Sequence, residues 1–295
     1  MQRWLMRAAI AVSLALSTAC GAQRASERPL LDDAGRLPVQ AGHLRVMTFN
    51  VKSCAEGLDQ VAAAIRAAKP DVVALQEVDN GTTRSGGVDQ ARELARRLDF
   101  PWAVHIPTTQ MYGGDYGMAL LSRVPIKSLE RRPLPVPRGL EPRAVARAIL
   151  DVGGTEIALY KAHLSPMPQR GRLRAEQATV VARMIAAETR PVILVGDFND
   201  TATSGAVRIL SSHLQDAWLA AGTGPAGTFP LPLVGSLRYD YVLASREFEI
   251  QRARVLPGDA SDHHPVVADL QLPAAFLANS APSTPSNAAP AATTP

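Results

Sequence analysis

The chain has 295 residues, 46% of them hydrophobic, and a formal net charge of +4. It is long enough to bury a substantial core in one large domain or two small ones. Residues 1–42 contribute +2 of the charge, from five arginines against three carboxylates, and no Lys/Arg run follows them. Because nonspecific nucleic-acid binders usually carry a basic patch, this charge does not identify nucleic acid as the partner.

The first twenty residues are typical of an export signal. Arg3 and Arg7 precede the apolar run AAIAVSLALSTA (8–19), which is too short to span a bilayer comfortably. The ending LSTAC resembles a bacterial lipoprotein signal, in which Cys20 becomes the acylated first residue. The alternative is a secretory signal cut after Ala19. We therefore expect an exported protein of the cell envelope, at the periplasmic face of the outer membrane if lipidated, and otherwise periplasmic or secreted.

Composition divides the rest of the chain into three parts. Residues 21–42 are polar and aperiodic, as in a flexible tether. Residues 279–295 form an uncharged tail rich in Pro, Ala, Ser and Thr, which lacks the apolar residues needed to fold. The folded domain is expected at 43–278, as a monomer that contacts a membrane only through the lipid anchor. Cys54 is expected to be a small buried residue, which leaves no disulfide framework.

Within this domain, helix and strand patterns are mixed without regular alternation. A strand is expected at 44–51, a helix at 58–68 that ends before Pro70, and an apolar strand at 71–78. This mixture favours mixed sheets covered by helices over a TIM barrel or a doubly wound sheet. Further patterns predict a helix at 87–98, a hairpin over 144–165 turning at Gly153-Gly154, a helix around 173–185, and strands at 192–199, 238–245, 249–256 and 264–272.

Polar residues recur where these apolar strands begin or end. A single carboxylate there would be an ordinary strand end, but a buried one is costly unless it is paired or bound to metal. Six such strand ends indicate one rim of one sheet system. They are Asn50, Gln76-Glu77, His163, Asp197 with Asn199, Asp240, and Asp262-His263.

The donor types in this set indicate a hard metal ion. Carboxylate and amide oxygens without cysteine favour Mg²⁺, with Mn²⁺ or Ca²⁺ as alternatives, over zinc. Such an ion, completed by water and substrate, serves phosphate-ester chemistry. Histidines nearby can donate hydrogen bonds to phosphoryl oxygens when a carboxylate keeps them protonated.

Eight short stretches carry a resemblance to a known family. They are, in chain order, TFNV, LQEV, YGMALLSR, EPRAV, AHLS, GDFND, RYDYVLAS and SDHHPV, and they span nearly all of residues 43–272. In this order they resemble the endonuclease/exonuclease/phosphatase superfamily. The resemblance implies an α/β (α+β) fold, a four-layered α/β sandwich of two mixed β-sheets packed face to face with helices outside.

The resemblance also implies roles for the acidic and amide residues. Glu77 would be the principal metal ligand with Asn50 beside it, and Asp262 a carboxylate near the metal. Asp197 would orient or deprotonate the attacking water, and Asn199 would hydrogen-bond the phosphoryl group.

Histidine roles follow in the same way. Asp240 would hold His263, and this pair would stabilise the negative charge growing on the phosphoryl oxygens. His163 would steady a phosphoryl oxygen or assist the leaving group. His264 is expected to be structural, because adjacent residues on an extended strand point to opposite faces; the choice of His263 over His264 rests on the resemblance.

Two arginines are candidate substrate contacts. Arg143, in EPRAV, and Arg84, just before a glycine-rich helix entrance, could each reach a substrate phosphate. The alternative for both is an ordinary solvated arginine. Met118 stands where many relatives have asparagine, which weakens the assignment to a nuclease.

The expected function is that of a Mg²⁺-dependent phosphoesterase that hydrolyses phosphodiester bonds by direct attack of water, as a nuclease or a lipid-headgroup phosphodiesterase does. Its partner would be a phosphate ester: nucleic acid, a phospholipid headgroup or an inositol phosphate. One alternative is a phosphomonoesterase acting on inositol-type phosphates. Another is a non-catalytic binding lipoprotein, which would have lost Glu77, Asp197 or His263, whereas the chain keeps all three.

Overall fold

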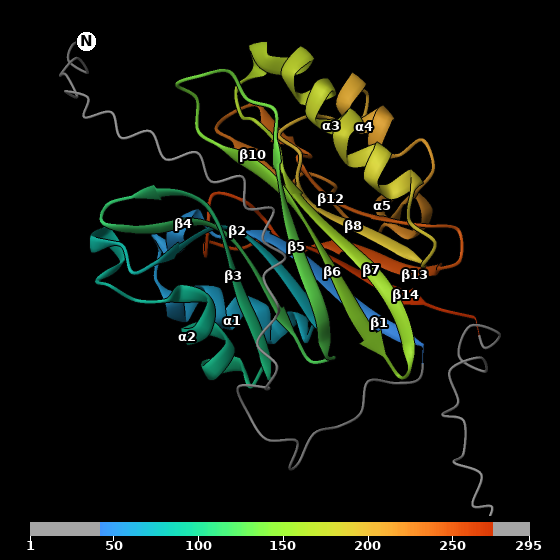
Figure 1. The fold of residues 1–295 in the computed structure, drawn as a ribbon, viewed down its shortest axis with the longest axis horizontal. Coiled ribbons are helices and arrows are strands. Elements are labelled where there is room, and N and C mark those ends of the chain that lie inside the picture. Colours follow the sequence, from blue (N-terminus) through green and yellow to red (C-terminus); the bar gives the residue numbers. More distant parts are fainter. Residues whose placement is uncertain (1–41, 274–295) are drawn as a thin grey trace, which may run out of the picture.

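The computed structural model describes residues 42–273, which form two six-stranded sheets packed face to face (Figure 1). Helices α1 (Leu58–Ala68) and α2 (Gln90–Leu98) cover the outer side of one sheet. Helices α3 (Gly171–Ala186) and α4 (Gly205–Leu210) cover the outer side of the other. The expected four-layered α/β sandwich is thereby confirmed.

Several expectations concern segments beyond this range. The export signal with Cys20, nearly all of the tether and the tail lie outside the described residues, so these assignments stay predictions. Within residues 42–273, no helix is both long and apolar enough to cross a membrane.

The first sheet consists, in spatial order, of β13 (Glu249–Val255), β14 (Val266–Gln271), β1 (His43–Asn50), β2 (Val72–Asn80), β4 (Gly114–Ser122) and β3 (Trp102–Met111). It is mixed, because β1 runs parallel to β2 while its other neighbouring pairs are antiparallel. Alternate residues of β1 face opposite layers: Val46 packs between the sheets, and Met47 packs under the helices.

The second sheet consists of β5 (Ile126–Leu134), β6 (Arg143–Val152), β7 (Thr155–His163), β8 (Val192–Asp197), β12 (Asp240–Ala244) and β9 (Gln215–Asp216). The predicted hairpin joins β6 to β7 through Gly153 and Gly154, which both have positive φ. A short hairpin of β10 (Phe229–Leu231) and β11 (Gly235–Leu237) lies outside both sheets, and α5 (Ala217–Ala221) packs against β12 and β13.

The helices follow the periodicity of their apolar residues. Helix α1 ends at Ala68, just before Lys69 in the left-handed conformation, and buries the expected face. Helix α2 begins at Gln90, three residues later than predicted, because the Asp89 side chain caps it by accepting a hydrogen bond from the Arg92 N–H.

A buried lysine connects the two sheets. Lys161 of β7 is 1% exposed, and its Nζ donates hydrogen bonds to the carbonyl oxygens of Leu75 and Ala119 in the first sheet. Burial lowers the pKa of this ammonium well below its ordinary value. Burial therefore favours the uncharged amine of Lys161, whose hydrogen bonds tie the strand of His163 to the strand that leads to Glu77.

We expect Lys161→Met to change how stability depends on pH. Between its lowered folded-state pKa and about pH 10.4, Lys161 binds a proton in the unfolded chain and not in the folded chain, so wild-type stability rises with pH over that range. The variant should lose this contribution, which reaches about 1.4 kcal/mol per pH unit, so its free energy of unfolding should rise less steeply with pH. Urea unfolding of both proteins at several pH values measures the two slopes; equal slopes would contradict a lowered pKa of Lys161.

Candidate active site

Strand register brings polar residues of the second sheet side by side. His163 at the end of β7 pairs with Asp197 at the end of β8, which in turn pairs with Asp240 at the start of β12. In the first sheet, Asn50 at the end of β1 pairs with Gln76 of β2. The Asn50 Nδ2 atom lies 3.1 Å from Asp197 Oδ2, so these rims of the two sheets meet at one edge of the sandwich.

Asn50 joins the carboxylates of the two sheets. Its Nδ2 donates to Glu77 Oε1 at 2.9 Å as well as to Asp197 Oδ2, and its Oδ1 accepts from the Lys52 N–H at 3.1 Å. The side chain is 1% exposed, so these contacts are shielded from water. Asn50 therefore holds the Glu77 and Asp197 carboxylates at a defined separation.

Glu77 occupies a strained position in β2. Its φ is +57°, and the pairing of β2 with β4 shifts register between Gln76 and Val78. A non-glycine residue at positive φ inside a strand is uncommon and often marks a functional site. Gln76 stays buried and donates to Thr48 Oγ1 at 3.0 Å, as a structural residue would. Glu77 is left partly exposed, with Asn50 as its one hydrogen-bond partner within residues 42–273.

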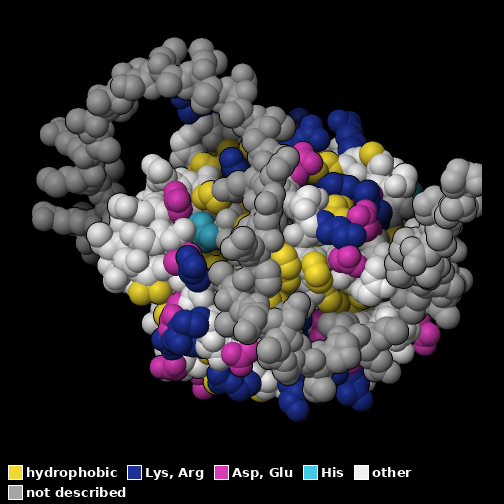
Figure 2. Space-filling view, turned by 60° about the horizontal axis from the view of Figure 1, so that its bottom comes forward, with side chains coloured by type: hydrophobic (Ala, Val, Ile, Leu, Met, Phe, Trp, Pro, Cys, Tyr) yellow, Lys and Arg dark blue, Asp and Glu magenta, His cyan; other side chains and the backbone are white. Residues whose placement is uncertain are grey.

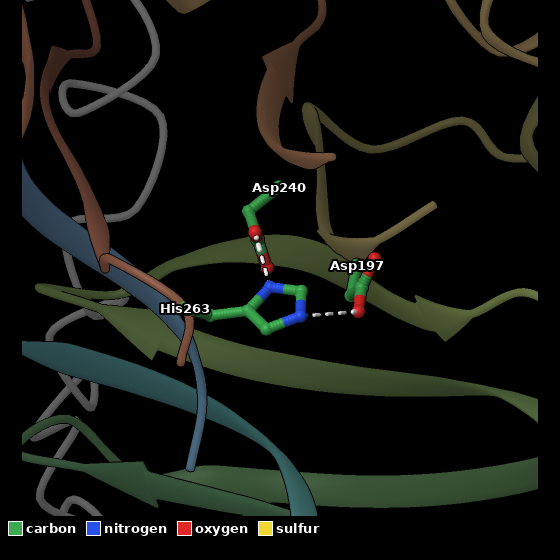
Figure 3. A group of neighbouring side chains, drawn as sticks. All are labelled: Asp197, Asp240 and His263. Carbon is green, nitrogen blue, oxygen red and sulfur yellow. Dashed lines mark hydrogen bonds and ion pairs between the residues drawn. The ribbon is translucent and has the colours of Figure 1, made fainter. Parts of the chain in front are cut away.

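His263 lies between two carboxylates (Figure 3). Its Nδ1 is 2.9 Å from Asp240 Oδ2, and its Nε2 is 3.8 Å from Asp197 Oδ2. Burial opposes the charged imidazole, but the charge and hydrogen bond of Asp240, together with Asp197 and Asp262, raise the pKa of His263 to about 10. His263 is therefore protonated at neutral pH and directs an N–H toward Asp197.

The Asp197 carboxylate is surrounded by N–H groups of neighbouring residues. Burial and the neighbouring Asp240 charge raise its pKa to about 7, although His263 and hydrogen bonds from Asn199 and Asn50 act against this rise. The Asn199 N–H donates to Asp197 Oδ1 at 2.8 Å, and φ of Asn199 is +51°. A buried carboxyl with a pKa near neutrality is suited to accepting a proton at physiological pH.

His163 presents a second N–H to the same carboxylate. Its Nε2 lies 3.7 Å from Asp197 Oδ2, and its Nδ1 lies 3.2 Å from Nη1 of Arg143. A guanidinium only donates, so Nδ1 must accept and the proton must reside on Nε2. Burial, with the positive charges of Arg143 and His263, lowers the pKa of His163 well below its ordinary value. His163 is thus a neutral donor.

We expect Arg143→Met to disturb this tautomer. Without the guanidinium, His163 Nδ1 loses its donor and the ring can take either tautomer or a second proton. Partners that orient a functional histidine contribute about 10- to 100-fold, and we expect a loss of that size in kcat. Nitrogen-15 NMR of the imidazole rings gives the protonated atom directly. Arg143→Lys should recover part of the activity; an unchanged Nε2–H tautomer in Arg143→Met would contradict the assignment.

Two sets of donors could hold a divalent cation. Asp197, Asp240 and His263 place ligand atoms within 4.8 Å of one another. However, Asp240 engages Nδ1 of His263, and a protonated imidazole has no free lone pair, so this group suits proton handling better. Glu77 is partly exposed and offers carboxylate oxygens, and the buried Asn50 beside it offers its amide Oδ1, which accepts from the Lys52 N–H. Such hard oxygen donors fit Mg²⁺, Mn²⁺ or Ca²⁺.

The remaining predicted residues lie around this centre. Asp262 is half-exposed and pairs with Lys52 Nζ at 3.1 Å. Asn199 Nδ2 donates to the Leu164 carbonyl at 3.1 Å, which orients its amide at the rim. Arg84 forms two 2.7 Å hydrogen bonds with the buried Asp79 carboxylate. Met118 is fully buried in the apolar core between the sheets and pairs with Gln76 across the strands.

Other contributors were not found by sequence reasoning. The ring of Phe229 lies 4.9 Å from the His263 imidazole, and Thr228 Oγ1 accepts from the Asp240 N–H at 3.1 Å. Glu141 Oε1 lies 2.9 Å from Arg143 Nη1. EPRAV pointed to Glu141 only as a neighbour of Arg143, and nothing local in the sequence marks Thr228 or Phe229, whose contacts are long-range.

A four-layered sandwich whose strand ends gather carboxylates, an asparagine and two histidines defines a class of hydrolases that act on phosphate esters. The chain belongs to the Endonuclease/Exonuclease/phosphatase family, because the model of that family matches residues 47–263. Members of this family are phosphoesterase hydrolases that typically use divalent metals. No curated protein sequence matches the chain significantly.

Solved structures support the same fold. The chain resembles an endonuclease/exonuclease/phosphatase from Beutenbergia cavernae at 28% identity and a TM-score of 0.66, covering 78% of this chain and 72% of that one. A mannosyl-6-phosphatase from Bacteroides thetaiotaomicron is 20% identical with a TM-score of 0.63, over 77% of this chain and 99% of that one. The catalytic domain of human Nocturnin, with bound sulfate, is 21% identical with a TM-score of 0.63, over 79% and 96%.

Proposed function

We propose that this protein is a Mg²⁺-dependent phosphodiesterase that hydrolyses its substrate by direct attack of water. The observation that carries the proposal is the convergence of three side-chain nitrogens on Asp197: those of Asn50, His163 and His263. The two histidine distances, 3.7 and 3.8 Å, are too long for direct hydrogen bonds. Both Nε2–H groups are therefore available to a ligand placed among them.

Glu77 and Asn50 would hold the cation, with Asp262 at the edge of the site. Bound there, Mg²⁺ would supply Lewis-acid stabilisation of the negative charge on phosphoryl oxygens. The chain itself contributes the geometry. The bulge at Glu77 aims the carboxylate, and the Asn50 amide keeps it beside Asp197.

Asp197 and the two histidines have separate roles: the carboxylate accepts a proton, and the imidazoles stabilise negative charge. Asp197 takes a proton from the attacking water, whose oxygen forms a new bond to phosphorus as one ester P–O bond breaks. The protonated His263, held by Asp240, donates a hydrogen bond to a phosphoryl oxygen and stabilises the charge growing there. His163 donates a second through Nε2–H. The departing oxygen takes a proton from solvent and Asp197 returns its proton to water, so the products are a phosphomonoester and an alcohol.

Charge pairing at the rim favours a diester over a monoester. A monoester carries a second negative charge, which a site normally meets with an additional cation. Both candidate arginines are already paired: Arg84 with Asp79, and Arg143 with Glu141. Lys and Arg also lie beside Asp and Glu on the face shown in Figure 2. The relatives named above include a phosphatase of a sugar phosphate, so phosphomonoesterase activity is the alternative outcome.

The test compares two chromogenic substrates with Mg²⁺: bis(p-nitrophenyl) phosphate, a diester, and p-nitrophenyl phosphate, a monoester. We expect preferential turnover of the diester, and DNA, sphingomyelin and inositol phosphates then test the natural class. A preference for the monoester would overturn the diesterase and favour the phosphatase. Absence of both metal binding and turnover would overturn the catalytic assignment and favour the non-catalytic binding lipoprotein.

We also propose that the protein is exported and anchored at the cell envelope through Cys20. The supporting observation is the LSTAC sequence that follows a positive start and an apolar run. Metabolic labelling with palmitate should mark the wild-type protein and not Cys20→Ser. Labelling of Cys20→Ser, or no labelling of the wild type, would contradict acylation at Cys20 and favour the ordinary secretory signal. Gel filtration of the purified protein tests the expected monomer.

A further inference from the structure

A cavity lies behind the segment that carries His263. This segment, residues 256–265, joins β13 to β14, and its base is closed by a 3.0 Å hydrogen bond from the Leu256 N–H to the Pro265 carbonyl. The cavity has a volume of about 310 Å³ and is lined by this segment on one side and by α1 on the other. Small-molecule sites in proteins measure about 300–1,000 Å³, so the cavity has the size of a site for a small ligand.

The wall of the cavity is almost entirely apolar. Ala64, Ala67 and Ala68 line it from α1, where their spacing of three and four residues places them on one face of the helix. Phe49, the neighbour of Asn50 in β1, lines it from the first sheet. Because alanine carries only a methyl group, this face of α1 leaves open a space that larger side chains would fill. An apolar body is therefore the favoured occupant.

A cationic side chain without an acidic partner also lines the cavity. Arg254 of β13 is half-buried, and within residues 42–273 its guanidinium forms no hydrogen bond or ion pair. His263 lines the cavity too, but its Nδ1 already engages Asp240 at 2.9 Å. Among the described residues that line the cavity, none is Asp or Glu. The charge that would complement Arg254 must therefore come from a ligand, as a single negative group attached to the apolar body.

We propose that this cavity is a second ligand site, which binds a medium-chain fatty acid. The alkyl chain lies between α1 and the 256–265 segment, and the carboxylate pairs with Arg254. Removal of each methylene from water favours binding, and the guanidinium offers two parallel N–H donors to the two carboxylate oxygens. The small volume favours a medium chain over the long chains of membrane lipids. A bound chain contacts the segment that carries His263, and it uses neither the metal nor the substrate of the proposed phosphodiesterase.

Calorimetric titration of the full-length protein with butanoate, hexanoate and octanoate tests the proposal. A chelator is present throughout, so that no carboxylate can bind through a metal ion. We expect the affinity to rise about fourfold with each added methylene, and octanoate to raise the melting temperature because it binds the folded state. Hydrogen exchange should slow in residues 58–68 and 256–265 when octanoate is bound. No binding of octanoate, an affinity independent of chain length, or protection confined to other segments would overturn the site.

Matched variants test the charge and the position of the site separately. Arg254→Gln removes the guanidinium charge and should weaken octanoate binding about tenfold, as expected for the loss of a charged hydrogen-bond partner. Ala67→Leu adds bulk at an exposed α1 position that lines the cavity and should weaken binding too, whereas Ala63→Leu, exposed on the same helix outside the lining, should not. Glu77→Gln should bind octanoate as the wild type does, which separates this site from the proposed metal site. Wild-type affinity in Arg254→Gln or in Ala67→Leu would overturn the proposal.

Discussion

Replacing His263 with alanine is expected to lower kcat about a thousandfold while leaving the protein folded. The imidazole is protonated at neutral pH because Asp240 raises its pKa to about 10, and its Nε2–H faces the space in front of Asp197. Removing one donor aimed at developing charge typically costs about 100- to 1,000-fold in kcat, and this donor carries a full charge. Turnover of bis(p-nitrophenyl) phosphate at saturating Mg²⁺ measures the loss.

Two further variants make the His263 result specific. His213→Ala removes an exposed histidine away from the site and should leave kcat unchanged. Asp240→Asn removes the charge that keeps His263 protonated, so it should lower kcat as well, and combining it with His263→Ala should add little further loss. Substantial retained activity in a folded His263→Ala protein would mean that another group stabilises the transition-state charge.

Replacing Asp197 with asparagine is expected to lower kcat by about 100- to 10,000-fold, the range for loss of a general base. Asparagine has nearly the same shape and can still accept the Asn199 N–H through its Oδ1. It cannot take a proton from water, and its Nδ2 cannot accept from Asn50, so both contacts of Oδ2 are lost. Asp259→Asn, at an exposed loop position, is the matched control and should retain wild-type kcat.

The ionisation of Asp197 and of His263 predicts how kcat depends on pH. Asp197 must lose its proton to act as a base, and its pKa is about 7, so wild-type kcat should rise with pH up to that value. His263 must keep its proton, and its pKa is about 10, so kcat should fall above it. In Asp197→Asn the limb near pH 7 should disappear from the residual activity. A variant that keeps this limb would show that a different group is the base.

The sequence correctly predicted helix and strand bounds that depend on interactions between residues close together in the chain. The helix at 58–68 has the bounds expected from its apolar periodicity and from Pro70, and the strand that ends at Asn50 follows its apolar run. Polar residues at strand ends pointed to one rim, and strand register indeed places His163, Asp197 and Asp240 side by side. In these cases the sequence pattern and the tertiary structure agree, because the spacing of apolar residues follows from which face of each helix or strand is buried.

Other parts depend on contacts between distant segments, which no local pattern contains. Arg84 looked free in the sequence, yet the buried Asp79 binds it and Tyr112 stacks against it. Arg143 was a candidate substrate contact, with an ordinary solvated arginine as the alternative, and the structure buries it with Nη1 3.2 Å from Nδ1 of His163. Lys161 lies in an apolar strand pattern, and its carbonyl partners, Leu75 and Ala119, belong to the first sheet, which no local pattern could indicate.

The most direct test of the central claim is the metal dependence of diester hydrolysis. Purified wild-type protein is stripped with a chelator and assayed with bis(p-nitrophenyl) phosphate, before and after addition of Mg²⁺, beside Glu77→Gln. We expect no turnover in the stripped protein, recovery with Mg²⁺, and little recovery in Glu77→Gln at the same Mg²⁺ concentration. Full turnover in the presence of chelator, or equal recovery in Glu77→Gln, would contradict a phosphodiesterase whose metal is held by Glu77.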